Sequence, residues 1–358
     1  MVRVSLDHVT KTFGSVKALQ DVSVGIDEGE LFLMVGPSGC GKTTALRIIA
    51  GFYKPDTGSV GFDDKEVNDL PPYKRNTGMV FQNYALWPHM NVYENVAFGL
   101  KMRKVAPSDR VNRIKRVLDI VRMREFAERF PNQLSGGQQQ RIALARALVI
   151  EPSVLLLDEP LSNLDAKLRV EMRSEIRRIQ KELRITTIYV THDQTEALAI
   201  ADRIAVMNVG SVSQVGTPRD VYEYPMNAFV ASFMGEPNML GGRIDSISKE
   251  SGLARVRIDE SLVLEGRLPR EFSTYSNGDK VSCFIRQESI LGNEQSEQNF
   301  QAKVTEASYQ GQTEHYTLEL SNGSVLRAVG FNPSAGPHVV GDTMTIQLPA
   351  EKIMVLKE

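Results

Sequence analysis

Short apolar runs alternate with segments of helical periodicity over about the first 235 residues of the chain. This order is typical of a parallel β-sheet covered by helices. The run VLLLD (154–158) has no polar alternation, so we expect that strand to be buried on both faces. The expected strands are residues 30–36, 77–82, 153–159, 186–192 and 203–208.

The sequence becomes helical in character between residues 83 and 150. Ser108 is placed to cap a helix that runs through residues 108–123. Apolar residues recur along this helix at helical spacing and predict one buried stripe. The stripe consists of Val111, Ile114, Leu118 and Val121. We therefore expect a helical subdomain at about residues 83–150.

After about residue 236 the pattern changes to short strands of alternating polarity. In residues 315–329, Leu318 and Leu320 alternate with polar neighbours, and Asn322-Gly323 predicts a two-residue hairpin turn. The segments ARVRID and KVSCFIR repeat the alternation. We predict a first domain at residues 1–235 and a small antiparallel β-barrel or sandwich at residues 236–358.

Composition narrows the class of protein. The hydrophobic fraction of 42% and charged fraction of 24% are those of an ordinary globular protein. The formal net charge of -2 gives no reason to expect a nucleic-acid partner. Cys40 and Cys283 match no metal-binding spacing and predict reduced cytosolic thiols. No window is apolar enough to predict a membrane span or a signal peptide.

The stretch GPSGCGKTT (36–44) fits the phosphate-binding pattern G-x-x-x-x-G-K-[ST], between an apolar strand and a helix. Its glycines let backbone N–H groups surround phosphate oxygens, Lys42 can neutralise the β- and γ-phosphates, and the Thr43 hydroxyl can bind Mg²⁺. We predict an ATP site in an α/β P-loop NTPase fold. The expected nucleotide contacts are Gly36, Pro37, Ser38, Gly39, Cys40, Gly41, Lys42, Thr43 and Thr44.

Two acidic residues end the apolar strand VLLLD. Asp158 would hold Mg²⁺ or its water, and Glu159 would polarise the water that attacks the γ-phosphate. The alternative is a pair of acids that cap the following helix. The nearby phosphate loop favours the catalytic interpretation.

His192 and Gln82 each end another predicted strand. Carboxyl ends of parallel strands meet at one edge of the sheet, where nucleotides bind. His192 could contact the γ-phosphate and position water, and Gln82 could complete the Mg²⁺ shell or orient water. A single histidine is more often structural, so these two predictions depend on the surrounding motifs.

The segment NQLSGGQQQR (132–141) is a second Ser-Gly-Gly turn at a helix start, without a lysine and without a strand before it. The phosphate loop, Gln82, LSGGQ (134–138), VLLLDEP (154–160), SNLD (162–165) and His192 occur in the order and approximate spacing of an ABC-transporter ATPase subunit. The chain resembles this family over about residues 1–235. The resemblance implies a RecA-like core with a helical subdomain, and it implies that Phe13 stacks on adenine.

The resemblance also gives the second glycine turn a role. In this family the turn binds the γ-phosphate of ATP held by the phosphate loop of the other subunit, which implies a homodimer or a dimer with a close homologue. The physical basis is an anion site at a helix N-terminus. It implies nucleotide contacts from Ser135, Gly136, Gly137 and Gln138, and coupling between the two sites through Asp165.

Residues 83–100 resemble the surface that receives a cytoplasmic helix of the membrane permease in this family. The implied docking residues are Tyr84, Trp87, His89 and Met90, which we expect to be exposed. The alternative is that these residues belong to the core of the helical subdomain.

The segment from residue 189 onwards resembles importer ATPases for sugars, polyamines and ferric iron, whose C-terminal domain is an OB-like regulatory and dimerisation module. Relatives have Arg-Pro-Glu where this chain has IRQES (285–289), and GEPNML with YQGQTEHYTLEL is closer to the polyamine and iron branch. The resemblance implies two integral-membrane permeases, an extracytoplasmic solute-binding protein, and a peripheral position on the cytoplasmic face of the inner membrane. The alternatives are a soluble ABC ATPase acting on nucleic acid or ribosomes, a ligand-regulated ATPase switch, and an exporter subunit.

Overall fold

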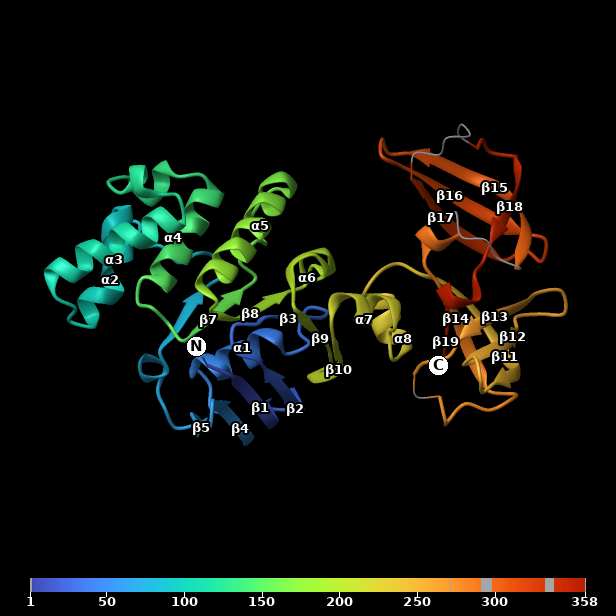
Figure 1. Cartoon of the computed structure of the whole chain (residues 1–358), viewed down its shortest axis with the longest axis horizontal. Helices are drawn as coiled ribbons and strands as arrows, with labels where there is room; N and C mark the ends of the chain where they lie inside the picture. Colours follow the sequence, from blue (N-terminus) through green and yellow to red (C-terminus); the bar gives the residue numbers. More distant parts are fainter. Residues whose placement is uncertain (1, 271, 291–297, 332–337, 358) are drawn as a thin grey trace. The chain divides into compact units, whose positions relative to one another are not determined.

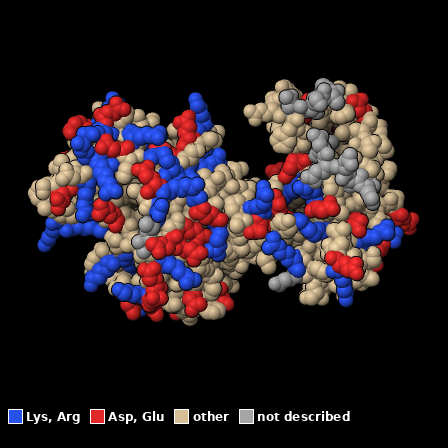
Figure 2. All heavy atoms as spheres, viewed as in Figure 1, with Lys and Arg blue, Asp and Glu red and all other residues tan. Residues whose placement is uncertain are grey.

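The computed structural model describes residues 2–270, 272–290, 298–331 and 338–357. Its contacts divide the chain into two units, Met1–Pro218 and Arg219–Glu358, each drawn with its elements in Figure 1. On the face drawn in Figure 2, Asp and Glu are interspersed among the Lys and Arg side chains of both units. Among the described residues, no helix is both long and apolar enough to cross a lipid bilayer.

The first unit contains a six-stranded sheet with the order β10-β9-β3-β8-β7-β6. All its neighbouring strands run parallel except β10, which is antiparallel to β9. All five predicted strands are present, and β3, β7 and β8 are buried at every position, as expected for runs without polar alternation. The strands are β3 (Leu31–Val35), β6 (Thr77–Val80), β7 (Val154–Asp158), β8 (Thr186–Thr191), β9 (Arg203–Asn208) and β10 (Ser211–Gly216).

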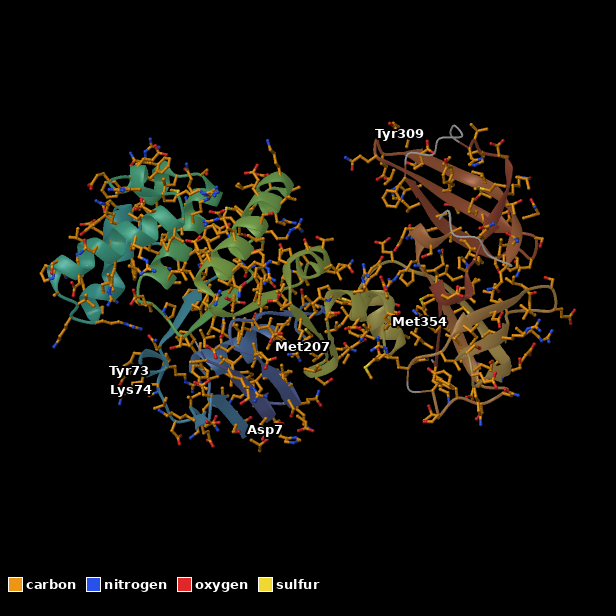
Figure 3. All side chains as sticks on the ribbon, viewed as in Figure 1. Asp7, Tyr73, Lys74, Met207, Tyr309 and Met354 are labelled. Atoms are coloured by element: carbon orange, nitrogen blue, oxygen red, sulfur yellow. The ribbon has the colours of Figure 1, made fainter. Side chains whose placement is uncertain are left out.

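A second, antiparallel sheet of the first unit has the order β2-β1-β4-β5. Its strands are β1 (Val4–Phe13), β2 (Val16–Ile26), β4 (Thr57–Phe62) and β5 (Lys65–Glu66). Its inner side chains, such as Leu6 and Val60, share one apolar core with Phe32 of β3, Leu156 of β7 and Met207 of β9. Met207 is labelled in this unit in Figure 3. This core holds the two sheets together.

Helices follow the strands of the first unit and form its helical region. The α-helices are α1 (Lys42–Ala50), α2 (Val92–Met102), α3 (Pro107–Ile120), α4 (Gly136–Leu148), α5 (Ala166–Leu183) and α6 (Gln194–Ile200). Short 3-10 helices are η1 (Pro72–Lys74), η2 (Arg124–Phe126) and η3 (Pro131–Gln133). The predicted helical subdomain corresponds to α2, α3 and α4, which contact one another.

Two details of the prediction for α3 are wrong. The helix begins at Pro107 with Ala106 as its N-cap, so Ser108 lies inside the first turn. Proline is favoured at this first position because its missing N–H would have no partner there and its φ is already helical. Val111 is 53% exposed, whereas Ile114 and Leu118 are buried as expected.

The second unit begins with α7 (Pro218–Glu223) and α8 (Ala228–Phe233) and continues as β-structure. A closed barrel has the order β11-β12-β13-β19-β14, and a separate sheet has the order β17-β16-β15-β18. The barrel strands are β11 (Asn238–Ser248), β12 (Leu253–Arg257), β13 (Val263–Arg267), β14 (Lys280–Ile285) and β19 (Ile353–Lys357). The sheet strands are β15 (Asn299–Tyr309), β16 (Thr313–Leu320), β17 (Val325–Phe331) and β18 (Thr343–Gln347), and the 3-10 helices are η4 (Gln287–Ser289) and η5 (Ala350–Lys352).

The hairpin between β16 and β17 forms where the alternation predicts it, but its turn is longer. The Leu320 N–H donates to the Ser324 carbonyl at 2.9 Å, which leaves residues 321–323 in the turn instead of two residues. Gly323 takes the left-handed φ of 81°, which suits glycine. Leu318 and Leu320 enter the apolar core of this unit together with Cys283 of the barrel.

Candidate functional site

The phosphate loop, residues 36–44, joins β3 to α1. Gly41 has a φ of 102°, and a Cβ built there would lie 2.4 Å from the Ala18 carbonyl oxygen, so only glycine fits. Lys42 is 5% exposed, and its ammonium donates to the carbonyl oxygens of Gly36 at 2.7 Å and Pro37 at 2.9 Å. These bonds hold the charged end of Lys42 over the loop.

A hydroxyl and a carboxylate meet beside this loop. Thr43 Oγ1 donates to Asp158 Oδ1 at 3.0 Å, and Asp158 is only 6% exposed at the end of β7. Burial raises the pKa of Asp158, while the hydrogen bond from Thr43 opposes that rise. A desolvated carboxylate next to a hydroxyl is a pair of hard oxygen ligands, which is the donor chemistry that Mg²⁺ prefers.

Three of the predicted catalytic residues form one cluster. Gln82 Nε2 donates to Glu159 Oε2 at 3.3 Å, and His192 Nδ1 lies 3.1 Å from the same oxygen. Gln82, Glu159 and His192 follow β6, β7 and β8, which are adjacent parallel strands. Their carboxyl ends therefore meet at the edge where the phosphate loop follows β3, which is the edge where open α/β sheets bind their ligands.

The backbone of Glu159 contributes to this geometry. Its φ is 45°, a left-handed value that is uncommon for a residue with a side chain. The Glu159 N–H donates to the Val190 carbonyl of β8 at 3.0 Å and so fixes this conformation. Asn163 Nδ2 donates to the Gln82 carbonyl at 2.9 Å, which ties the segment after β7 to the end of β6. Asn163 lies within the segment SNLD (162–165), but no role was predicted for it from the sequence.

Phe13 lies at the end of β1, where the family resemblance implies an adenine contact. Its side chain is 42% exposed and is therefore not part of the strand core. Tyr53 packs edge-to-face against it with ring centroids 5.2 Å apart, and Lys11 Nζ lies 5.5 Å from its ring centroid. Tyr53 was missed because no sequence pattern places the segment after α1 beside β1.

The second glycine turn caps α4. Ser135 Oγ accepts a hydrogen bond from the Gln138 N–H at 3.4 Å, and Gln138 Oε1 accepts one from the Ser135 N–H at 2.9 Å. This capping box leaves the remaining N–H groups of the first turn directed out of the helix. A Cβ at Gly137 would lie 2.9 Å from the Leu168 side chain. Asp165 is the N-cap of α5, and its Oδ1 accepts a hydrogen bond from the Leu168 N–H at 2.9 Å.

The phosphate loop and this turn do not form one site within the chain. In the described residues, no hydrogen bond or ion pair joins Ser135 or Asp165 to residues 36–44. The structure brings together Lys42, Thr43 and Asp158 on one side, and Gln82, Glu159 and His192 on the other. The turn at Ser135 lies in the helical region and belongs to neither of these two groups.

A groove of about 410 Å³ opens between the end of β6 and helices α2 and α4. Trp87 and Phe98 line it with ring centroids 4.3 Å apart, and the Arg146 guanidinium lies 4.8 Å from the Trp87 ring. His89 is exposed and Met90 half-buried, but Tyr84 is only 6% exposed, so its expected exposure is wrong. Tyr84 and Ala85 both have left-handed φ values, 60° and 48°, and this reversal turns Tyr84 inward.

One buried amide holds the loop beside this groove. Asn95 is 0% exposed, and its Nδ2 donates to the carbonyls of Trp87 at 3.1 Å, Met90 at 2.9 Å and Asn91 at 3.0 Å. Its Oδ1 accepts from the Trp87 N–H at 2.9 Å. The loop 87–91 is therefore fixed from inside.

Comparison with known proteins identifies the family. A model described as ABC transporter matches residues 19–162, and a model described as TOBE domain matches residues 280–356. The Fe(3+) ions import ATP-binding protein FbpC of Fusobacterium nucleatum is 42% identical over 100% of this chain and 94% of its own length. The chain belongs to the ABC transporter family. The predicted family, with its ATPase fold followed by an OB-like all-β domain, is confirmed.

Other ABC transporter relatives match over nearly the whole chain. The spermidine/putrescine import ATP-binding protein PotA of Rubrobacter xylanophilus is 46% identical over 99% of this chain and 94% of its own length. The maltose/maltodextrin import ATP-binding protein MalK of Vibrio cholerae is 42% identical over 98% of this chain and 94% of its own length.

Solved structures of ATP-binding cassettes match part of this chain. A dimeric post-hydrolysis state of the ATP-binding cassette MJ0796, bound to ADP and Pi, has a TM-score of 0.54 and 36% identity, over 60% of this chain and 99% of that chain. The chain is thus an ATP-binding cassette with ATPase activity. The two family models leave residues 163–279 unmatched, so the boundary after residue 235 stays a prediction.

Proposed function

We propose that this chain powers a prokaryotic ABC importer by binding and hydrolysing ATP, with the residues gathered at the carboxyl edge of the parallel sheet as its catalytic site. The observation that carries this proposal is the cluster of Gln82, Glu159 and His192 beside the Thr43–Asp158 pair. The relatives named as import ATP-binding proteins, matched over nearly their full length, support the direction of transport.

Each side chain has a chemical role in this proposal. Backbone N–H groups of residues 36–44 and the Lys42 ammonium bind the ATP phosphates, and Phe13 packs on the base. Thr43, Gln82 and Asp158 would hold Mg²⁺, which neutralises phosphate charge when bound. Glu159 accepts a proton from the attacking water, because its carboxylate is half-buried and already faces His192 and Gln82.

A second copy of the chain, or a close homologue, would complete each site. The Ser135–Gln138 turn lies at the positive end of α4, where first-turn N–H groups lack intrahelical acceptors, and such groups suit the γ-phosphate held by the partner's loop. A lysine is not needed in the turn, because Lys42 of the partner subunit supplies that charge. Asp165, at the start of α5, would couple the two sites. The dimeric structure of the similar cassette MJ0796 supports this arrangement.

Two integral-membrane permeases would dock at the groove beside Trp87, and an extracytoplasmic solute-binding protein would deliver the solute to them. The groove offers the aromatic pair Trp87 and Phe98 with the Arg146 guanidinium, which suits an amphipathic helix with an acidic residue. The chain would then be peripheral on the cytoplasmic face of the inner membrane. The solute belongs to the polyamine, iron or sugar class, and stimulation of ATP hydrolysis in proteoliposomes with the cognate permeases would identify it.

Replacing Glu159 with glutamine tests the catalytic assignment. We expect Glu159→Gln to bind ATP, to elute as a dimer with Mg-ATP in size-exclusion chromatography, and to hydrolyse ATP about 100-fold or more slowly, because the amide cannot accept a proton. Glu66→Gln, on the exposed strand β5, is the matched control and should keep the wild-type rate. An unchanged hydrolysis rate in Glu159→Gln would refute the assignment.

A further inference from the structure

A buried hydrogen-bond network joins β8 to α6, the two elements on either side of His192. Tyr189 of β8 is 0% exposed, and its hydroxyl donates to Glu196 Oε2 of α6 at 2.7 Å. Glu196 is itself only 3% exposed. Burying a carboxylate costs free energy unless hydrogen bonds compensate for the lost water, so packing alone does not account for this residue.

Hydroxyl groups compensate for the burial of the Glu196 carboxylate. Burial raises the pKa of Glu196, and hydrogen bonds from the Tyr189 and Thr191 hydroxyls oppose that rise. Burial also raises the pKa of Tyr189 well above its ordinary value, so its phenol remains a donor at neutral pH. Thr191 is the last residue of β8 and is 3% exposed. The carboxylate therefore interacts with the residue directly before His192.

The Thr191 hydroxyl connects this carboxylate to the backbone after His192. Thr191 Oγ1 accepts a hydrogen bond from the Asp193 N–H at 3.0 Å, which closes a turn across His192. A hydroxyl has one proton and two lone pairs, so a Thr191 hydroxyl that donates to Glu196 keeps a lone pair for the Asp193 N–H. Glu196 thus determines how the Thr191 hydroxyl is oriented.

Asp193 is also fixed from its other side. It is the N-cap of α6, and its Oδ1 accepts from the N–H groups of Thr195 at 2.8 Å and Glu196 at 3.4 Å. The two neighbours of His192 are therefore both connected to Glu196, Thr191 through its side chain and Asp193 through its cap.

The imidazole of His192 depends on this backbone for its position. Its side chain is 55% exposed, so surrounding residues do not enclose it. Among the described residues, its ring nitrogens have one polar partner, Glu159 Oε2, at 3.1 Å from Nδ1. A displacement of about 1 Å at a reacting group can slow a reaction about 100-fold. Small movements of the turn 191–193 would therefore matter for catalysis.

We propose that Glu196 and Thr191 are positioning residues for His192, and that the buried carboxylate, through the Thr191 hydroxyl, holds the imidazole at Glu159 for ATP hydrolysis. Both residues are almost fully buried, so they act through His192 without contacting the nucleotide. This inference rests on the proposed role of His192 in catalysis and extends it to the residues that fix its geometry.

Substitutions at Thr191 separate its hydroxyl from its shape. We expect Thr191→Val, which keeps the volume and loses the hydroxyl, to lower the kcat for ATP about tenfold in the full chain and to keep KM within about twofold. Thr191→Ser retains the hydroxyl and should restore the wild-type kcat. Glu196→Gln offers one oxygen to two hydroxyl donors and should also lose about tenfold, and it provides the same test if Thr191→Val does not fold.

A double-mutant cycle with His192→Ala distinguishes positioning from a merely structural role. If Thr191 acts through the imidazole, Thr191→Val should change the rate by less than about twofold once that imidazole is absent. Single-turnover assays with radiolabelled ATP measure such low rates. A similar loss in both backgrounds would overturn the proposal, because it would show that Thr191 acts independently of His192.

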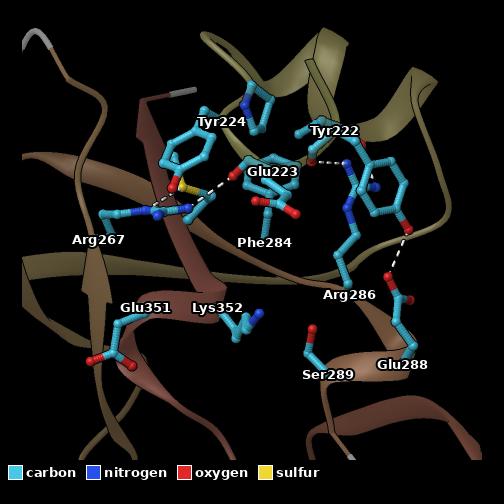
Figure 4. Close-up of a pocket in the computed structure, with 13 residues that line it drawn as sticks. Tyr222, Glu223, Tyr224, Arg267, Phe284, Arg286, Glu288, Ser289, Glu351 and Lys352 are labelled. Carbon is cyan, nitrogen blue, oxygen red and sulfur yellow. Dashed lines mark hydrogen bonds between the residues drawn. The ribbon is translucent and has the colours of Figure 1, made fainter. Parts of the chain in front are cut away.

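A second tyrosine–glutamate pair supplies a matched control. In the β-rich unit the Tyr222 hydroxyl donates to Glu288 Oε1, also at 2.7 Å, with Arg286 over the Tyr222 ring (Figure 4). Glu288→Gln alters the same kind of hydrogen bond in the other unit and should keep the wild-type kcat. Glu30→Gln replaces a carboxylate that is 7% exposed, directly before β3, and should also keep that kcat even if it unfolds at a lower temperature.

Nuclear magnetic resonance of the imidazole rings provides a measurement that does not require catalysis. The chain has five histidines, so the ring signals of a chain with isotope-labelled histidine can be assigned by comparison with His192→Gln. We expect Thr191→Val to shift the His192 signal and Thr191→Ser to leave it unchanged.

The outcomes separate this inference from the proposed function. Wild-type hydrolysis in His192→Ala would refute the proposed role of His192 and overturn this inference with it. Slow hydrolysis in His192→Ala together with a wild-type kcat in Thr191→Val, or with an unmoved His192 signal in that variant, would overturn this inference alone. The proposed transport function would then be unaffected.

Discussion

Single residues of this chain show how backbone conformation directs a side chain to its chemistry. Glu159 adopts a left-handed φ of 45°, which costs roughly 1–2 kcal/mol for a residue with a Cβ. Its N–H bond to Val190 maintains that conformation, and the carboxylate then meets Gln82 and His192. The same backbone geometry at Tyr84 has the opposite effect and turns an aromatic ring inward.

Glu159 and Tyr84 show which residue positions could be predicted from the sequence and which could not. Glu159 was predictable because its position at the end of a buried strand fixes where it lies. The burial of Tyr84 was not predictable, because two consecutive left-handed residues, Tyr84 and Ala85, occur there without a glycine or asparagine that would indicate them.

Cys283 gives a prediction at this scale. Burial in the barrel raises the pKa of its thiol to about 12. In Cys40→Ser, which leaves Cys283 as the single thiol, we expect a disulfide reagent at pH 8 to react about 1,000-fold more slowly with the native chain than with the chain in guanidinium, since only the thiolate reacts. Reaction at similar rates in both states would contradict this.

The same shift predicts a pH dependence of stability. The pKa of the Cys283 thiol is raised in the folded state, so its contribution to the free energy of unfolding is fully present below the unfolded pKa. That contribution is lost as pH rises from about 9 towards about 12. The thiolate fraction of Cys283 in the native chain also grows over this alkaline range, so its rate of reaction with the disulfide reagent should increase.

Helices and strands carry the next level of organisation, and here periodicity predicted more. Every parallel strand of the first unit was located from its apolar residues, and the signal is clearest in β3 and β7, because burial on both faces leaves a continuous hydrophobic run. The strands β1, β2 and β4 were missed, since β-bulges interrupt their pairing and break the alternation. Helix α4 was predicted from its Ser-Gly-Gly start, and the observed cap at Ser135 matches that signal.

The N-terminus of α4 supplies the prediction at the scale of elements. In Ser135→Arg a long cationic side chain would block the turn that the partner's phosphate would contact. We expect this variant to bind nucleotide as a monomer within about twofold of wild type, by fluorescent-nucleotide titration, and to lose ATP hydrolysis about 100-fold or more. Ser108→Arg, on the exposed start of α3, is the control and should keep both properties. Loss of monomer binding in Ser135→Arg would contradict a site that acts in trans.

At the scale of the whole molecule, each of the two units has an apolar core of its own. Residues such as Phe32, Leu156 and Met207 form the core of the first, and Cys283 and Leu318 belong to that of the second. Composition and the change of periodicity near residue 236 predicted two domains. The solute could not be predicted, because the proposed transport function assigns its recognition to partner polypeptides.

Separate cores predict two transitions in calorimetry of the full chain. Mg-ADP at 100 times its dissociation constant should stabilise the first unit by about 2.7 kcal/mol and raise only its transition, by roughly 5–10 °C. Lys42→Ala should abolish this shift without moving the other transition. A single transition, or an equal shift of both, would show that the units unfold together.

The buried amide of Asn95 has a mechanical consequence. Its four hydrogen bonds brace the loop 87–91 before any partner arrives. A loop held by these bonds is rigid. A permease helix docked beside Trp87 would therefore be displaced together with the ATPase. Without the Asn95 hydrogen bonds the loop would be flexible. ATP hydrolysis would then continue while less of the conformational change reached the permease.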